Sequence, residues 1–149
     1  MKKIILGLCM ILIIGSSYAG NKFAPVEKLI LASFKVDFAG AKNVTWKEIN
    51  GYQKATFTMG DQVISAYYQA GGELIATTRN ILSDQLPVRL QIVLKKQFSN
   101  FWITELSEIS IEGETSYYLT LQDSNKNLVL KSGTFSEWEV LKSIKKPSY

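Results

Sequence analysis

The stretch from residue 44 to residue 79 constrains the fold most, because three turn signals divide it into four short segments. The turns are Asn50-Gly51, Gly60-Asp61 and Gly71-Gly72. Asn-Gly suits a two-residue turn whose central residues both take positive φ. The segments between the turns are rich in Val, Ile, Thr, Tyr and Phe, which strands favour. The stretch therefore predicts a meander of four antiparallel strands.

The turns also predict which residues face each other and which share a face. The first turn predicts the cross-strand pairs Ile49–Tyr52, Trp46–Ala55 and Val44–Phe57. Because side chains alternate between the two faces of a sheet, the three turns together predict one apolar face. Its members are Val44, Trp46, Ala55, Phe57, Met59, Ile64, Ala66, Tyr68 and Ile75. A slip of one residue in any turn would break this agreement.

The opposite face of the predicted meander is polar. Its members are Thr45, Lys47, Ile49, Tyr52, Lys54, Thr56, Thr58, Val63, Ser65 and Tyr67. Four of them form a candidate partner-binding set, namely Lys47, Tyr52, Lys54 and Tyr67. Tyrosines are enriched in protein interfaces, but pairing between neighbouring strands explains exposed tyrosines equally well. Both interpretations of the tyrosines stay open.

The first 19 residues have the pattern of a signal peptide. Lys2 and Lys3 form a basic start, an apolar run covers residues 4–14, and Ser17-Tyr18-Ala19 places small residues for cleavage after Ala19. The apolar run is shorter than the ~20 residues that span a bilayer, so an uncleaved anchor is the weaker alternative. We expect residues 20–149 to form the mature domain, in the periplasm or outside the cell, with no stable membrane span.

Composition excludes several chemistries. The chain contains no histidine, and Cys9, its one cysteine, lies in the predicted signal peptide. Catalysis by Ser-His-Asp or Cys-His sets and metal binding by thiolate or imidazole are therefore excluded. Loss of Lys2 and Lys3 lowers the net charge from +4 to about +2, which gives no reason to expect nucleic acid as a partner. We expect a protein that is not an enzyme, with no catalytic residues, cofactor or metal.

Helical spacing appears before each set of predicted strands. Apolar residues at helical intervals predict helices over residues 25–34 and from residue 83 or 87 to residue 98. The second helix precedes four further strands, near residues 102–111, 115–122, 127–131 and 135–144. The sequence thus predicts an α+β fold with a pseudo-repeat, residues 25–80 and 83–144. Each half has a helix and four strands, and both helices pack on one face of an antiparallel sheet.

The turn at Glu112-Gly113 leaves two registers open in the second half. One register buries Leu106, Tyr117, Leu119 and Leu121, and the other favours Ile109 and Ile111. We favour the first register because it buries both leucines of the strand that follows the turn.

Several short motifs carry a family resemblance. They are Phe34, Phe38-Ala39-Gly40-Ala41, Val44-Thr45-Trp46, Gly51-Tyr52, Phe57, Tyr67-Tyr68, Gly71-Gly72 and Leu86-Pro87. The chain resembles the PepSY-like family of small exported bacterial proteins, described as β-lactamase-inhibitor-like. That family commonly has Phe-Pro-Gly-Ala where this chain has Phe38-Ala39-Gly40-Ala41, a departure that should only loosen the turn.

The resemblance implies a two-layer α+β domain like that of the β-lactamase inhibitor protein, whose open sheet face grips a protein. It carries over no functional residue, because no matching binding motif is present. We therefore expect an exported binding module that holds a protein or peptide of the cell envelope on its open sheet face. The alternative is an inhibitor of an envelope or secreted hydrolase, of the β-lactamase or protease type. An enzyme that uses only Asp, Glu, Lys or Tyr would need a deep pocket with close carboxylates.

Overall fold

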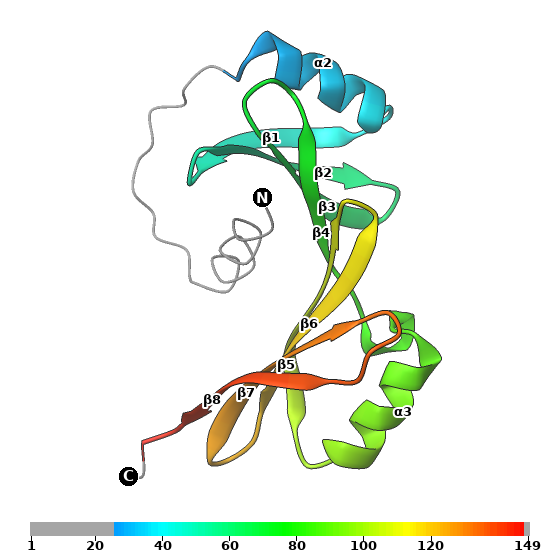
Figure 1. Ribbon diagram of the computed structural model, residues 1–149, viewed down its shortest axis with the longest axis vertical. Coiled ribbons are helices and arrows are strands. Elements are labelled where there is room, and N and C mark those ends of the chain that lie inside the picture. Colours follow the sequence, from blue (N-terminus) through cyan, green and yellow to red (C-terminus); the bar gives the residue numbers. More distant parts are fainter. Residues whose placement is uncertain (1–25, 148–149) are drawn as a thin grey trace.

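The computed structural model describes residues 26–147, which form two helices, a short 3₁₀ turn and one eight-stranded sheet (Figure 1). The elements are α2 (Lys28–Asp37), β1 (Lys42–Ile49), β2 (Tyr52–Met59), β3 (Gln62–Tyr68), β4 (Leu74–Asn80), η1 (Ser83–Gln85), α3 (Val88–Gln97), β5 (Trp102–Ile111), β6 (Glu114–Gln122), β7 (Lys126–Gly133) and β8 (Glu139–Lys145). The predicted signal peptide lies outside the described residues. None of the helices within residues 26–147 is long and apolar enough to cross a membrane.

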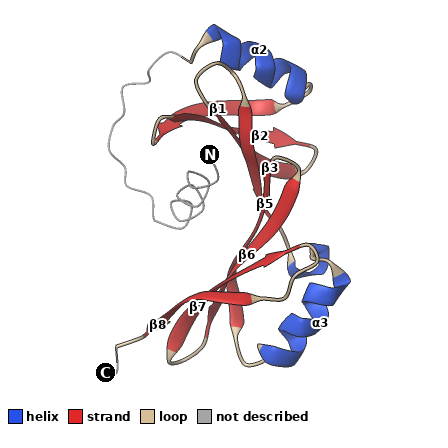
Figure 2. Cartoon of the chain, in the orientation of Figure 1, coloured by secondary structure: helices blue, strands red, loops and turns tan. Residues whose placement is uncertain are grey.

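The sheet is an antiparallel meander in which every strand pairs with the next along the chain, from β1 to β8. The pairing of β4 with β5, from Ala76 opposite Ile111 to Asn80 opposite Ser107, joins the two halves. Figure 2 shows a curved sheet with α2 near one end and α3 near the other. The predicted order of a helix and four strands, repeated once, agrees with this architecture.

A continuous row of paired residues shows that both helices cover the same face. The row crosses six strands and comprises Phe57, Ile64, Arg79, Glu108, Tyr117 and Ser132. Phe57 belongs to the core beneath α2, and Tyr117 belongs to the core beneath α3. Because paired residues project to the same side of a sheet, α2 and α3 pack on one face, as predicted. We call the other face, which no helix covers, the concave face.

Aromatic packing holds α2 on the first half. The Phe34 ring lies edge-on to Phe57 and Trp46, with centroids 5.1 and 5.2 Å away. Ala55 and Ala66 beneath them are fully buried, and such small side chains leave room for these rings. Edge-to-face pairs add stabilisation beyond the burial of their area. The predicted apolar face is therefore the core of this half.

Two further contacts fix the position of α2. The Tyr68 hydroxyl donates a hydrogen bond of 2.9 Å to Asp37 Oδ2 at the end of the helix. Gly72 lies directly against the helix, since a Cβ there would come within 3.0 Å of the Leu29 carbonyl oxygen. Gly72 also has a φ of +88°, which favours glycine. The third predicted turn, Gly71-Gly72, therefore reverses the chain and also leaves room for helix α2.

Leucines form the core beneath α3. Leu90 on the helix is fully buried against a cluster that contains Leu106 and Leu119, and these two pair across β5 and β6. The favoured register of the Glu112-Gly113 hairpin is confirmed. Trp138 closes this core and donates from Nε1 to the Leu90 carbonyl oxygen at 3.3 Å.

Two β-bulges overturn parts of the predicted apolar face. Lys42 pairs with Thr58 but Thr45 pairs with Thr56, so Val44 and Phe57 do not pair, and Val44 is partly exposed. In β4 the register shifts opposite Tyr67 and Tyr68, and Ile75 packs on the concave side. An extra residue in one strand breaks the alternation from which both placements were predicted.

Element ends also differ from the prediction. Helix α2 runs to Asp37, three residues beyond the predicted end. Strand β8 begins at Glu139 rather than residue 135, because a turn precedes it. The Ser132 hydroxyl donates to the Ser136 carbonyl oxygen, and the Ser136 N–H donates to the Gly133 carbonyl oxygen. This turn leaves Phe135 88% exposed.

We expect Phe34→Ala to lower the free energy of unfolding by about 3–5 kcal/mol, because it empties the centre of the aromatic core. Denaturant titration followed by circular dichroism measures this loss. Val36→Ala on the same helix is the matched control, since Val36 is 81% exposed, and it should change stability by less than about 0.5 kcal/mol. Equal losses for both variants would contradict the assigned core.

We expect Tyr68→Phe to cost about 1–2 kcal/mol at neutral pH through the lost hydrogen bond to Asp37. Burial raises the pKa of Tyr68 well above its usual range, and Asp37 raises it further. Unfolded tyrosine ionises above a pKa of about 10 while folded Tyr68 stays protonated, so stability falls as the pH rises past that value. In Tyr68→Phe this alkaline decline should become shallower by up to about 1.4 kcal/mol per pH unit. An unchanged slope between pH 10 and 11, measured by denaturant titration, would refute the assignment.

Candidate functional site

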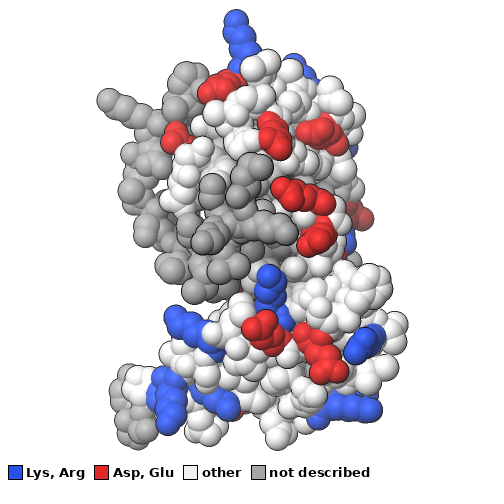
Figure 3. Space-filling model, viewed as in Figure 1, with Lys and Arg blue, Asp and Glu red and all other residues white. Residues whose placement is uncertain are grey.

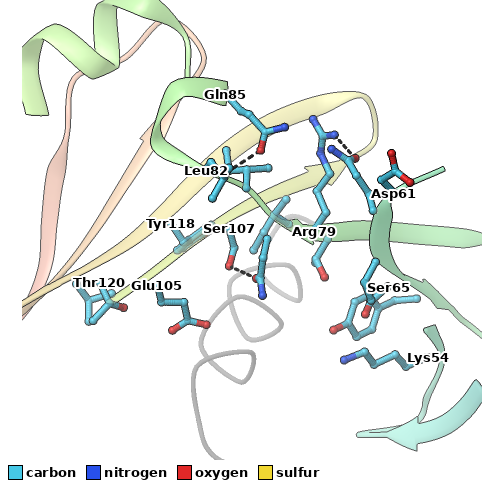
Figure 4. A pocket seen from close by; sticks show the side chains of 18 residues that line it. Lys54, Asp61, Ser65, Arg79, Leu82, Gln85, Glu105, Ser107, Tyr118 and Thr120 are labelled. Atoms are coloured by element: carbon cyan, nitrogen blue, oxygen red, sulfur yellow. Dashed lines mark hydrogen bonds between the residues drawn. The ribbon is translucent and has the colours of Figure 1, made fainter. Parts of the chain in front are cut away.

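The concave face contains a hollow of about 710 Å³ that spans the join between the two halves. Strands β2 to β7 line it, with side chains that include Lys54, Tyr67, Thr78, Ser107 and Tyr118. Figure 4 shows Lys54 and Ser65 on one side of this hollow and Tyr118 and Thr120 on the other. Because the strands come from both halves, the β4–β5 pairing builds the hollow.

Hydroxyl groups supply much of the polar surface of the hollow. The Thr56 and Ser65 hydroxyls lie 3.3 Å apart across β2 and β3. Ser107 donates from Oγ to Asn80 Oδ1 at 3.2 Å across β4 and β5 (Figure 4). These neutral groups pair with one another, so the charged side chains of the concave face dominate its electrostatics.

Each half places one lysine over one tyrosine on this face. Lys54 Nζ lies 5.5 Å from the centre of the Tyr67 ring, and Lys131 Nζ lies 5.5 Å from the centre of the Tyr118 ring. In both cases the two residues are partners on neighbouring strands. Such contacts contribute about 0.5–1 kcal/mol at exposed sites and more where water is excluded. The two pairs fix the lysine side chains against the sheet.

Three of the four predicted binding residues are accessible on the concave face. Lys47 and Lys54 are direct partners across β1 and β2, with Lys47 exposed and Lys54 half-buried. Tyr52, at the adjacent end of β2, is also half-buried. The structure therefore brings these three residues together at one end of the concave face. Whether they bind a partner stays a prediction.

Tyr67, the fourth predicted residue, is 1% exposed and does not present its ring to solvent. It forms a small cluster with Ala76, against which Tyr52, Ile75 and Ile111 pack. The bulge that turns Ile75 towards this side explains part of the burial. The prediction of a uniformly wet face is wrong here, because the second side of the sheet has an apolar cluster of its own. Tyr67 belongs to the floor of the site.

Burial perturbs the ionisable groups of this corner. It lowers the pKa of the Lys54 ammonium below its usual range, and the charge of Lys47 lowers it further. It raises the pKa of Tyr67, an effect that the neighbouring Thr78 side chain opposes. Among the described residues, no group meets both the distance and the angle of a hydrogen bond to the buried Tyr67 hydroxyl. The Lys54 ammonium and the Tyr67 hydroxyl are therefore both partly desolvated at this end of the concave face.

The overall charge distribution is mixed. Figure 3 shows acidic and basic side chains on both halves, with Lys and Arg more frequent over the lower half of the view. Asp and Glu gather over the upper half of this view, so its two halves differ in the sign of the side chains that predominate. Local lysine positions on the concave face therefore matter more than net charge.

The sequence did not point to the second half of this face, which includes Tyr118, Val129 and Lys131. Tyr118 and Val129 are buried there, and Trp102 at the start of β5 is 66% exposed. Alternation from Leu119, once its register was settled, would have placed Tyr118 and Lys131 on the concave side. The alternation pattern could have predicted this placement, but it depended on the register of the Glu112-Gly113 hairpin, for which the sequence allowed two possibilities.

The carboxylates of the hollow do not face each other. Figure 4 shows Asp61 and Glu105 at opposite ends, with Ser107 between them. Within residues 26–147, no cluster of three or more Asp, Glu, His or Cys side chains could hold a metal ion. Arg79 and Glu108 form an ion pair of 2.8 Å in the row that faces the helices. The arrangement does not provide the close carboxylates that an enzyme of this composition would need.

The chain has the BLIP-like fold. It is similar to a BLIP-like protein from Bacteroides fragilis NCTC 9343, with a TM-score of 0.72 and 14% identity over 83% of this chain and 89% of that one. It is also similar to a DUF2874 family protein from Bacteroides uniformis ATCC 8492, with a TM-score of 0.71 and 12% identity over 83% of this chain and 90% of that one. A third similar structure is that of a proposed periplasmic protein from Bacteroides eggerthii DSM 20697, with a TM-score of 0.71 and 14% identity over 83% of this chain and 89% of that one.

Neither a model of a known protein family nor any curated protein matches the sequence. At 12–15% identity the structural similarity shows the fold alone. The narrower resemblance to the PepSY-like family stays a prediction.

Proposed function

We propose that this protein is an exported, non-enzymatic binding module that holds a protein or peptide of the cell envelope on its concave face. The observation that supports the proposal most is the hollow, which strands of both halves line while the helices occupy the other face. Curvature and fixed lysine–tyrosine pairs give that face the shape and chemistry of a receptor. Interfaces use such tyrosine-rich, water-excluding centres.

The sequence and the comparisons support the location and the lack of catalysis. The first 19 residues have the pattern of a signal peptide, and a protein of the same fold from Bacteroides eggerthii is a proposed periplasmic protein. The mature chain has neither histidine nor cysteine, which removes the commonest nucleophiles and bases. Binding without chemistry is the function that remains best supported.

We expect Thr120→Tyr to abolish partner capture, because Thr120 lines the hollow and a tyrosine there would fill it. The tagged protein and its variant would be compared for proteins retained from envelope extract, identified by mass spectrometry. Gln97→Tyr on the exposed end of α3 is the matched control and should retain the wild-type partners. The melting temperatures of both variants should stay within a few degrees of wild type. Capture by Thr120→Tyr at the wild-type level would rule out the concave face.

The alternative function is inhibition of a secreted hydrolase, which rests on the likeness to a BLIP-like protein. It requires that the concave face block a substrate cleft. Titration of the protein into serine β-lactamase and protease assays should then give stoichiometric loss of activity that Thr120→Tyr relieves. Unchanged rates across such a panel would remove this alternative and leave the binding module standing.

A further inference from the structure

Lys47 and Lys54 form a like-charged pair at one end of the concave face. They are direct partners across β1 and β2, where side chains of paired residues lie next to each other. Two like charges in such positions destabilise a sheet. The fold therefore keeps a repulsive contact that any neutral residue would remove.

In the part of the chain that the structure describes, no acidic side chain forms an ion pair with Lys47 or Lys54. The concave-facing positions of β1–β4 contain no acid, and the row through the pair continues from Tyr67 to Ala76 and Ile111 before it meets Glu114 on β6. Asp61 lines the hollow but lies at the β2–β3 turn, beyond Ser65 in Figure 4. Within residues 26–147 the ion pairs are Arg79–Glu108 and Arg89–Glu137, and neither involves the two lysines.

The surroundings of Lys54 strengthen its electrostatic attraction to a negatively charged group. Lys54 is half-buried and held over the Tyr67 ring, so its ammonium is only partly solvated. Hydrogen bonds and charge contacts strengthen where water is partly excluded. Tyr52 lies at the end of the same strand, next to the pair, and offers a hydroxyl and an aromatic edge.

Building on the proposed function, we infer that the Lys47–Lys54 pair binds carboxylates of an acidic peptide segment in the partner. A carboxylate between the two ammonium groups replaces their repulsion with two attractive contacts. Lysine ammonium groups act as compact point charges, so two of them can contact one anionic group from both sides. The pair lies beside a hollow that Lys54 helps to line and that crosses strands β2 to β7, and such a concave site suits a peptide rather than a flat bilayer surface.

The test uses the full chain and an N-acetylated hexaglutamate peptide as the probe, with titration calorimetry at two salt concentrations. We expect binding to the wild type that weakens as salt screens the charges. The double variant Lys47→Gln, Lys54→Gln should bind at least about tenfold more weakly, as expected for loss of close charge contacts. The matched control Lys95→Gln, Lys96→Gln removes the same charge from the exposed end of α3 and should bind as the wild type does.

Stability separates a binding defect from a folding defect. Lys47→Gln removes the repulsion but keeps the contact of Lys54 with the Tyr67 ring, so its melting temperature should equal or exceed that of the wild type while peptide binding falls. A clearly lower melting temperature would mean that the lysine stabilises the fold, and it would overturn the inference.

Other probes can overturn the inference in distinct ways. Failure of the wild type to bind hexaglutamate, or equal loss in both double variants, would refute a specific site. Binding of inorganic phosphate at the peptide's affinity would reduce the pair to a simple anion site. Binding to phosphatidylglycerol vesicles that depends on Lys47 and Lys54 would assign the pair to a lipid surface instead.

Envelope capture separates this inference from the proposed function. If Thr120→Tyr loses the partner but the Lys47→Gln, Lys54→Gln variant keeps it, the concave face binds without the lysine pair and only the inference fails. If neither variant loses the partner, the proposed function itself fails. Loss in both, with the controls intact, supports both.

Discussion

Alternation of side chains, preserved without interruption across the β4–β5 join, is the constraint on which the structure depends. The row from Phe57 to Tyr117 keeps the same side in both halves, so α2 and α3 cover one face and leave the other open. Had the join slipped by one residue, the helices would cover opposite faces and no shared hollow would exist. The receptor-like shape is thus a consequence of one register, that of Ala76 opposite Ile111.

The ion pair of Arg79 and Glu108 lies in that same row, at the point where the two cores end. Arg79 also donates to Gln62 Oε1 on β3, so one guanidinium links three strands across the join. An apolar residue here would extend the cores towards each other, whereas the polar link leaves the halves as separate cores on a shared sheet. Because breaking such a pair leaves a partner unsatisfied, this contact favours the observed register over a slipped one.

The sequence predicts the two-helix, eight-strand order and most of the face assignments, because turn residues and alternation are local properties. It fails at Val44 and Ile75, since a bulge inserts one residue and nothing in the local pattern marks the position. It fails also at Tyr67, whose burial depends on Ile111 from the other half of the chain. Lys47 and Lys54 were placed together correctly because the Asn50-Gly51 turn fixes their pairing. The local sequence does not tell which side chains surround the two lysines. Only the folded sheet shows that the concave-facing positions of β1–β4 contain no acid.

The Lys47–Lys54 contact is one of two lysine–lysine pairs between neighbouring strands of the described sheet, since Lys126 also lies opposite Lys145. Other cross-strand contacts are favourable, such as the hydroxyl pair of Thr56 with Ser65 and the ion pair of Arg79 with Glu108. Backbone hydrogen bonds lower the pKa of the Asp123 carboxylate, and in the second lysine pair the charge of Lys126 lowers it further. The Lys54–Tyr67 contact offsets part of the cost of this pair, but the repulsion by Lys47 and the desolvation of Lys54 are unfavourable. Natural proteins tolerate local destabilisation mainly where function requires it. The Lys47–Lys54 pair lies on the open face, beside the hollow, where a partner would supply the missing negative charge.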